Sequence, residues 1–106
     1  MTDEEIKAII KRRRLQILVH SCIYYRFGDN IISDFSYDMW GKELGALQVK
    51  YPDLSKAVPD YYEWFKDYTP ACTSGYQLPI SKPEVVAKAE YLLRIHKRYQ
   101  DSTNYH

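Results

Sequence analysis

Apolar residues recur at helical spacing along three long segments of the 106-residue chain. In the first segment, Thr2 and Glu5 form a capping-box signature, and a mainly apolar stripe follows at roughly helical spacing. We therefore predict a helix over about residues 3–26. The positions of this stripe are Ile6, Ile9, Ile10, Ile17, Leu18, Ser21, Cys22 and Tyr25.

The second segment has the most regular pattern of the chain. Residues 28–30 are turn formers, and Ser33 is a suitable N-cap for a new helix. An apolar stripe with steps of three and four residues then runs as far as Pro52, where we expect the helix to end. The members of this stripe are Tyr37, Trp40, Leu44, Leu47 and Tyr51.

The remainder of the chain predicts two more helices. We expect a connection over residues 53–60 and a short helix within residues 58–68, with a loop over residues 69–83. Ser81 and Glu84 form a second capping-box signature, which predicts a final helix to about Gln100 and a frayed tail over residues 101–106. No segment alternates with the period of a strand. The sequence thus predicts an all-α fold, a single domain over residues 1–106 built as a small bundle of three long helices plus a short one.

Composition narrows the classes of partner. Fifteen Lys and Arg against fourteen Asp and Glu give a net charge of +1, which argues against binding of nucleic acid by the chain alone or of an anionic membrane. No apolar run approaches the ~20 residues of a membrane span, and the acidic start does not resemble a signal peptide. We expect a soluble, cytoplasmic protein. Eleven tyrosines are more than most chains of this size carry, and they suit a binding surface as well as a core.

A basic run, residues 11–14, is the first candidate for binding chemistry, because clustered cations can bind phosphates or nucleic acid. Successive residues of a helix turn by about 100°, so four in a row cannot face one ligand. We favour a solvated helix face, with one or two cations left to meet a phosphate near the corner described next.

His20 and His96 lack a partner Ser, Cys or Asp at a suggestive spacing, so we interpret them as core or surface residues. Cys22 fits a buried small apolar residue, and the cysteine spacing predicts neither a zinc site nor a disulfide framework.

The corner between the first two long helices, residues 24–38, is dense in tyrosines and acids. If a helix begins at Ser33, Asp34 and Asp38 share one face at its first turn, and Tyr37 lies beside them. Acids in a first turn also complement the helix dipole, and Tyr37 begins the core stripe, so spacing alone leaves a structural and a binding role evenly balanced.

The binding role suits a flat cationic ring. Tyrosine faces attract a cation, and carboxylates accept hydrogen bonds from sugar hydroxyls or from an amide. Tyr24 and Tyr25 end the first helix and reach the same corner. The acids would repel phosphates, which would therefore point toward Arg26 or the cations of the first helix.

The same corner resembles the N-terminal helical (Ia) subdomain of NAD-dependent bacterial DNA ligases. The shared pattern is a Tyr-Tyr pair, seven intervening residues, [SP]-D-x-x-Y-D, an apolar helix and P-x-L, and it runs without a gap from Tyr24 to Leu54. In that family the subdomain recognises the nicotinamide mononucleotide half of NAD. The resemblance implies that the contacts here are Tyr24, Tyr25, Asp34, Tyr37 and Asp38, with the tyrosines beside the nicotinamide and the aspartates on the ribose side.

The chain also departs from the ligases. Asn30 stands where they usually have proline, Ser36 stands where they usually have glutamate, and the adenylation motif Lys-x-Asp-Gly is absent from the sequence. The segment 65–78 with the closing helix is similar to small stand-alone ligase-related proteins of bacteriophages.

We therefore expect a non-enzyme that binds NAD, nicotinamide mononucleotide or a related nucleotide as ligand, with no catalytic cofactor and no metal. One role is a phage-encoded sponge for NAD-derived immune signals. There are two alternatives. The chain could be an accessory protein or inhibitor that docks on a DNA ligase or another nucleotidyltransferase. It could also be an NAD-cleaving enzyme that uses Asp34 or Asp38. The corner alone forms only one side of a binding site, so a second wall is needed. We expect it to come from residues 55–106 or from a second copy of the chain in a homo-oligomer. Candidates within residues 55–106 are Tyr61, Tyr62, Trp64, Tyr68 and residues 73–76.

Overall fold

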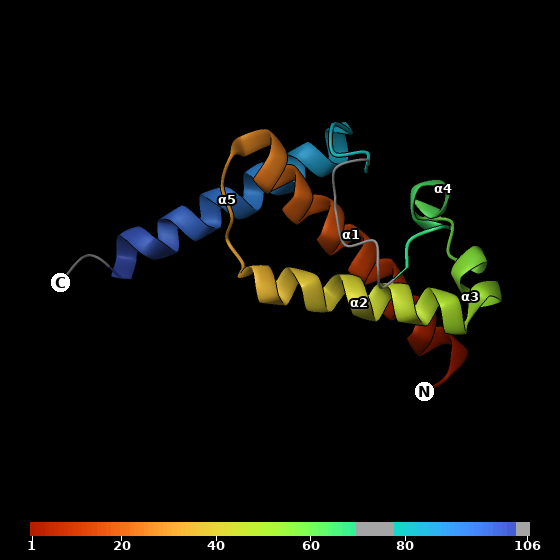
Figure 1. Ribbon diagram of the computed structural model, residues 1–106. Coiled ribbons are helices and arrows are strands. Elements are labelled where there is room, and N and C mark those ends of the chain that lie inside the picture. Colours follow the sequence, from red (N-terminus) through yellow and green to blue (C-terminus); the bar gives the residue numbers. More distant parts are fainter. Residues whose placement is uncertain (70–77, 104–106) are drawn as a thin grey trace.

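The computed structural model of the chain describes residues 1–69 and 78–103, and this part forms five helices and no strand (Figure 1). The three long helices are separated by a six-residue corner after the first and by two short helices after the second. The helices are α1 (Asp3–Phe27), α2 (Asp34–Lys50), α3 (Pro52–Ala57), α4 (Tyr62–Phe65) and α5 (Pro83–Thr103). The predicted all-α bundle of three long helices is confirmed, with two short helices instead of one.

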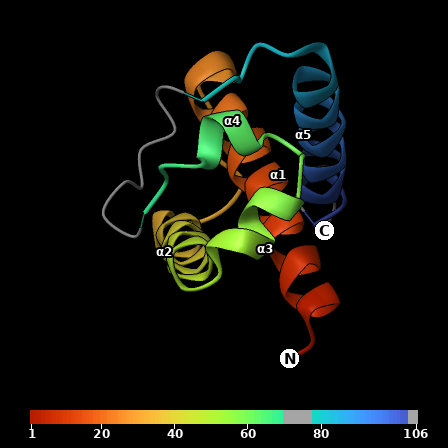
Figure 2. The same ribbon diagram turned by 90° about the vertical axis from the view of Figure 1, so that its right-hand side faces the viewer.

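Helix α1 is the centre of the arrangement. It packs against α2, α3 and α5, and Figure 2 shows it running between α2 and α5, which lie on opposite sides of it. The capping box at Thr2 starts this helix as predicted, because the Thr2 hydroxyl accepts from the backbone N–H of Glu5 at 3.2 Å. The C-terminal half of α5 extends beyond the other helices (Figure 1).

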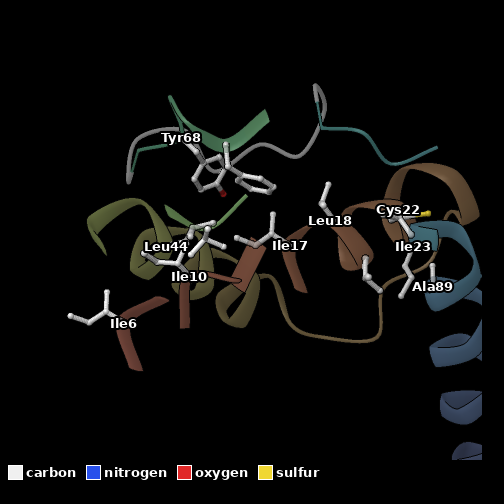
Figure 3. Close-up of a cluster of buried hydrophobic side chains, with 13 residues drawn as sticks. Ile6, Ile10, Ile17, Leu18, Cys22, Ile23, Leu44, Tyr68 and Ala89 are labelled. Carbon is white, nitrogen blue, oxygen red and sulfur yellow. The ribbon is translucent and has the colours of Figure 1, made fainter. Parts of the chain in front are cut away.

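The hydrophobic core follows the length of α1 (Figure 3). Ile10 and Ile17 are fully buried in the half of α1 that faces α2, α3 and α4, where Leu44 and Phe65 are also buried. Cys22 and Ile23 lie near Ala89 of α5, as Figure 3 shows. Burial of side chains of this size stabilises the fold by about 1.5–3 kcal/mol each.

One buried cation joins α1 to α2 and to α3 with the connection that follows it. Arg14 is 0% exposed, and its guanidinium donates to Gln48 Oε1 at 3.0 Å, to the carbonyls of Val58 and Asp60 at 2.8 and 2.9 Å, and to both oxygens of Ser55. Burial lowers the pKa of Arg14 to about 10, so the group still carries its charge at neutral pH. The predicted solvated face for residues 11–14 is therefore wrong for Arg14, because the connection after α3 presents buried carbonyls that need a donor.

The amide of Gln48 extends this network toward α4. Its Nε2 donates to the carbonyls of Phe65 and Tyr68 at 2.7 and 3.1 Å, while its Oε1 accepts from Arg14. Tyr61, at the start of α4, adopts a left-handed backbone with φ 57°, which is rare for a residue other than glycine. Its hydroxyl donates to Glu84 of α5 at 3.1 Å, and this contact ties α4 to the beginning of α5.

Three local predictions need correction. Pro52 begins α3 instead of introducing a connection, since proline is well suited to the first turn of a helix. Ser81 and Glu84 form no capping box in the part of the chain described, and the Glu84 carboxylate accepts from Tyr61. Helix α5 continues to Thr103, so residues 101–103 are helical and not a frayed tail. Most of the predicted loop over residues 69–83, with Cys72, and the end of the tail lie outside the described residues.

Cys22 is fully buried, as predicted. No helix within residues 1–69 and 78–103 is long and apolar enough to cross a membrane.

Replacing Arg14 by alanine should lower the free energy of unfolding by about 3–5 kcal/mol, because buried carbonyls and the Gln48 amide lose their charged donor. Denaturant unfolding followed by circular dichroism measures this change. The matched control is Arg12→Ala on the exposed side of α1, which should change stability by less than about 0.5 kcal/mol. Equal effects of the two substitutions would show that the Arg14 network does not hold the short helices in place.

Candidate functional site

The corner between α1 and α2 is fixed at both ends. Gly28 adopts φ 65°, a left-handed conformation that glycine tolerates best, and the N–H of Asp29 donates to the carbonyl of Ile23 at 3.1 Å to close the end of α1. At the other end the Ser33 hydroxyl accepts from the N–H of Ser36 at 3.1 Å and starts α2, as predicted. The backbone of residues 28–33 is thus held between two helix caps.

A pocket of about 190 Å³ lies at this corner. Its volume is below the ~300–1,000 Å³ of pockets that enclose a drug-sized ligand, so it suits a single ring with part of a sugar. The lining residues come from the last turns of α1, the corner and the first turn of α2. They are His20, Ser21, Tyr24, Tyr25, Asn30, Ile31, Ile32, Asp34 and Tyr37.

Four of the six predicted site residues line this pocket, namely Tyr24, Tyr25, Asp34 and Tyr37. The rings of Tyr24 and Tyr25 meet edge to face, with centroids 4.9 Å apart. Asp34 is exposed in the first turn of α2, where a carboxylate also complements the helix dipole. The corner therefore brings aromatic faces and a carboxylate together around one concave surface.

The other two predicted residues, Asp38 and Arg26, do not line the pocket. Asp38 is exposed on α2, and its charge is among the causes that raise the pKa of Tyr37, so it lies close to the pocket wall. Arg26 is exposed, and together with Glu90 of α5 it acts on the pKa of Cys22, which burial raises above its ordinary value. Arg26 is therefore within electrostatic range of Cys22 and is not one of the residues that line the pocket, so its contact with phosphates stays a prediction.

Tyr37 belongs both to the core and to the pocket. Its ring packs against the core, and its hydroxyl lies 2.7 Å from Ser21 Oγ of α1. Burial raises the pKa of Tyr37 above its usual value, while the hydrogen bond to Ser21 works in the opposite direction. The structural and the binding role of this corner, which spacing alone could not separate, are compatible in one side chain.

His20 forms part of the pocket wall and carries no charge at neutral pH, because burial lowers its pKa. Its ring is 5.3 Å from that of Trp40, and the Arg13 guanidinium lies 5.6 Å from the same indole. Arg13 also donates to Glu43 at 3.3 Å. A neutral imidazole leaves Asp34 as the charged side chain of the pocket lining, so the pocket favours a cationic or neutral ring over an anion.

Five lining residues were not predicted as site residues. Ser21, Asn30, Ile31 and Ile32 were not singled out as contacts, and His20 was treated as a core or surface residue. A signal existed for two of them, since His20 and Ser21 precede Tyr24 and Tyr25 by one helical turn and must share their face. The three corner residues carry no such periodicity, because their positions depend on how the two caps bend the backbone.

Residues 55–106 do not supply the expected wall in the described part of the chain. Helix α4 lies near the C-terminal end of α2, far from the α1–α2 corner (Figure 1). The lining residues of the pocket do not include Tyr61, Tyr62, Trp64 or Tyr68. Residues 73–76 lie outside the described residues. No group of three His, Cys, Asp or Glu side chains in residues 1–69 and 78–103 is placed to hold a metal ion.

Comparison with known proteins identifies relatives of the chain. It aligns over its whole length with the DNA ligase of Fervidobacterium nodosum, at 32% identity over 108 positions that make up 14% of that ligase. It is 45% identical to the DNA ligase of Pseudothermotoga lettingae over 57 positions, which are 54% of this chain and 8% of that ligase.

This chain is a relative of DNA ligases. The ligase of Sulfurihydrogenibium sp. is similar as well, at 39% identity over 54 positions that are 51% of the chain and 8% of that ligase. The ligase relative thus spans no more than 14% of the length of these enzymes. The resemblance seen at residues 24–54 is confirmed, and the matches are consistent with the N-terminal part of NAD-dependent ligases. No protein-family model matches the chain, and no solved structure matches it.

The ionisation of Tyr37 tests the geometry of the pocket wall. Because its pKa is raised in the folded state, Tyr37 should ionise above pH 10, the ordinary value for tyrosine, and Ser21→Ala should raise the pKa further by removing the hydrogen bond. The contribution of this group to stability is then complete below pH 10 and is lost as the pH rises through the folded pKa. NMR titration of the ring carbon that bears the hydroxyl measures the pKa. A midpoint at or below pH 10 would contradict the burial of this ring.

Proposed function

We propose that the ligase relative binds the nicotinamide mononucleotide half of NAD, or a nucleotide derived from it, without catalysing a reaction. The observation that supports this proposal is the pocket at the α1–α2 corner. It unites Tyr24, Tyr25, Asp34 and Tyr37, four of the five contacts that the resemblance to NAD-dependent ligases implies.

The chemistry of the pocket suits a pyridinium ring. Tyrosine rings attract a flat cation through their faces, a contact that contributes about 0.5–2 kcal/mol. The carboxylate of Asp34 adds attraction and accepts from ribose hydroxyls, and the side-chain amide of Asn30 can both donate to and accept from a carboxamide. The neutral His20 adds no repulsion to a cationic ring. Asp38, just outside the pocket, extends the acidic surface on the ribose side.

The size of the pocket limits what it encloses. About 190 Å³ accommodates the nicotinamide and part of its ribose, so the phosphates would lie outside, away from Asp34 and Asp38. A ligand held on one side binds weakly, because association costs several kcal/mol before contacts contribute. A binding protein of this kind suits sequestration of an abundant nucleotide, and a bacteriophage sponge for NAD-derived immune signals is the biological role that we propose.

One alternative has its own support. The whole chain aligns with a small part of a complete ligase, so it can dock on a ligase or another nucleotidyltransferase and supply or block the equivalent subsite. Binding of nicotinamide mononucleotide by the chain alone favours the sponge, whereas binding only in the presence of a ligase favours the accessory role.

Calorimetric titration with nicotinamide mononucleotide, NAD and AMP tests the proposal. We expect the first two to bind and AMP not to bind, since AMP lacks the cationic ring. Asp34→Asn and Tyr24→Ala should each weaken binding about tenfold or more, as expected for loss of a hydrogen bond to a charged group or of an aromatic face. Tyr24 is 55% exposed, so its truncation spares the core.

The matched control is Asp53→Asn, an exposed acid in the first turn of α3, which should leave affinity unchanged. Unchanged binding in the two pocket variants would move the site elsewhere, and absence of binding by the wild-type chain would refute the sponge. Chromatography of the titrated NAD provides a further outcome: released nicotinamide would show that the chain is an NAD-cleaving enzyme.

A further inference from the structure

Exposed apolar side chains gather at one end of the molecule. Of the ten large apolar residues that are exposed in the described residues, seven belong to the end of α1, the first half of α2 and the part of α5 over residues 90–98. On α2, Phe35 is 73% and Met39 is 48% exposed, and on α5, Tyr91 is 55% and Ile95 is 39% exposed. Each pair is spaced by four residues and therefore forms a short apolar row on its helix.

Each apolar row runs beside a charged row of the same spacing. On α2 the charged row is Asp34, Asp38 and Lys42, and all three side chains are exposed. On α5 the charged row is Glu90, Arg94 and Arg98, again all exposed. None of these six charged groups forms an ion pair with another described residue of the same chain.

The charges of the two charged rows are complementary only when the helices run in opposite directions. Read along α2, the charges are negative, negative and positive, and read backwards along α5 they are positive, positive and negative. In both helices each residue of the apolar row directly follows a charged one in the sequence. Viewed from outside with the N-terminus up, the charged row therefore lies on the same side of the apolar row in α2 and in α5. When two helices pack face to face and antiparallel, these two sides come together, so the charged rows face each other.

Within one chain the two faces cannot meet, because α1 separates α2 from α5 (Figure 2). We therefore propose that two copies of this chain associate, with the first half of α2 of one copy packed antiparallel on residues 90–98 of α5 of the other. Phe35 and Met39 then contact Ile95 and Tyr91. The charge pairs are Asp34 with Arg98, Asp38 with Arg94, and Lys42 with Glu90.

The association also changes the pocket. Asp34 lies both in the pocket lining and in the charged row, so the α5 of the second copy passes along the pocket edge and brings Arg98 there. This provides a cation for phosphates at the pocket, whose own lining residues include no lysine or arginine. This consequence rests on the proposed nucleotide binding, whereas the association itself does not.

Light scattering during size-exclusion chromatography, without nucleotide, tests the association. The wild-type chain should have about twice the 12.6 kDa mass of one chain. Asp34→Arg with Asp38→Arg places four like charges together, as does Arg94→Glu with Arg98→Glu. Each double variant should associate ~100-fold more weakly and elute as a monomer, since juxtaposed like charges cost several kcal/mol.

Mixing the two double variants should restore a dimer that contains one copy of each, because the reversed charges on α2 of one variant then face the reversed charges on α5 of the other. This rescue also shows that both variants are folded. The control is Asp53→Arg with Lys56→Glu on α3, which should leave the dimer intact.

A monomeric wild-type chain, dimeric double variants, or a mixture that stays monomeric would each overturn the proposed association. The nucleotide titration is independent of this result. A dimer that binds no nucleotide refutes the proposed function alone, and a monomer that binds nicotinamide mononucleotide refutes the association alone.

Discussion

The buried guanidinium of Arg14 is the constraint on which the rest of the structure depends. Its five N–H donors are all used within the described residues, by Gln48 on α2 and by oxygens of Ser55, Val58 and Asp60 in and after α3. A buried carbonyl without a donor is costly, so the short helices can lie in one position only relative to α1. Because the same cation also holds Gln48, it fixes the direction of α2 and hence the corner where α2 begins.

The pocket follows from that geometry and from two helix caps. With α1 and α2 fixed, Gly28 and Ser33 determine how residues 28–33 cross between them, and the tyrosines at the end of α1 then face the acid at the start of α2. The result is a one-sided site, acidic at its rim. An open acidic site needs both a second wall and a cation for any ligand with phosphates. In the association that we propose, the exposed basic part of α5 from a second copy would provide the two together.

Sequence patterning was sufficient wherever an element depends on local chemistry. The capping box at Thr2, the N-cap at Ser33 and the stripe of α2 each rest on residues close in the sequence, and the corner residues were found through their spacing and their resemblance to ligases. Patterning failed where distant residues decide. Arg14 looked like one of four solvated cations, because its carbonyl partners lie more than forty residues away. The roles of Asp38 and Arg26, which are not among the residues that line the pocket, stay predictions.

The central claim is that the α1–α2 corner holds the ring of a nicotinamide nucleotide. The most direct measurement is a titration of the isotopically labelled chain with nicotinamide mononucleotide, followed through the amide resonances. The account predicts shifts that saturate and are concentrated at Tyr24, Tyr25, Asp34, Tyr37 and residues 30–32, with none around Trp64 in α4. Saturating shifts confined to α4 and the start of α5, or the absence of shifts at the corner, would contradict it.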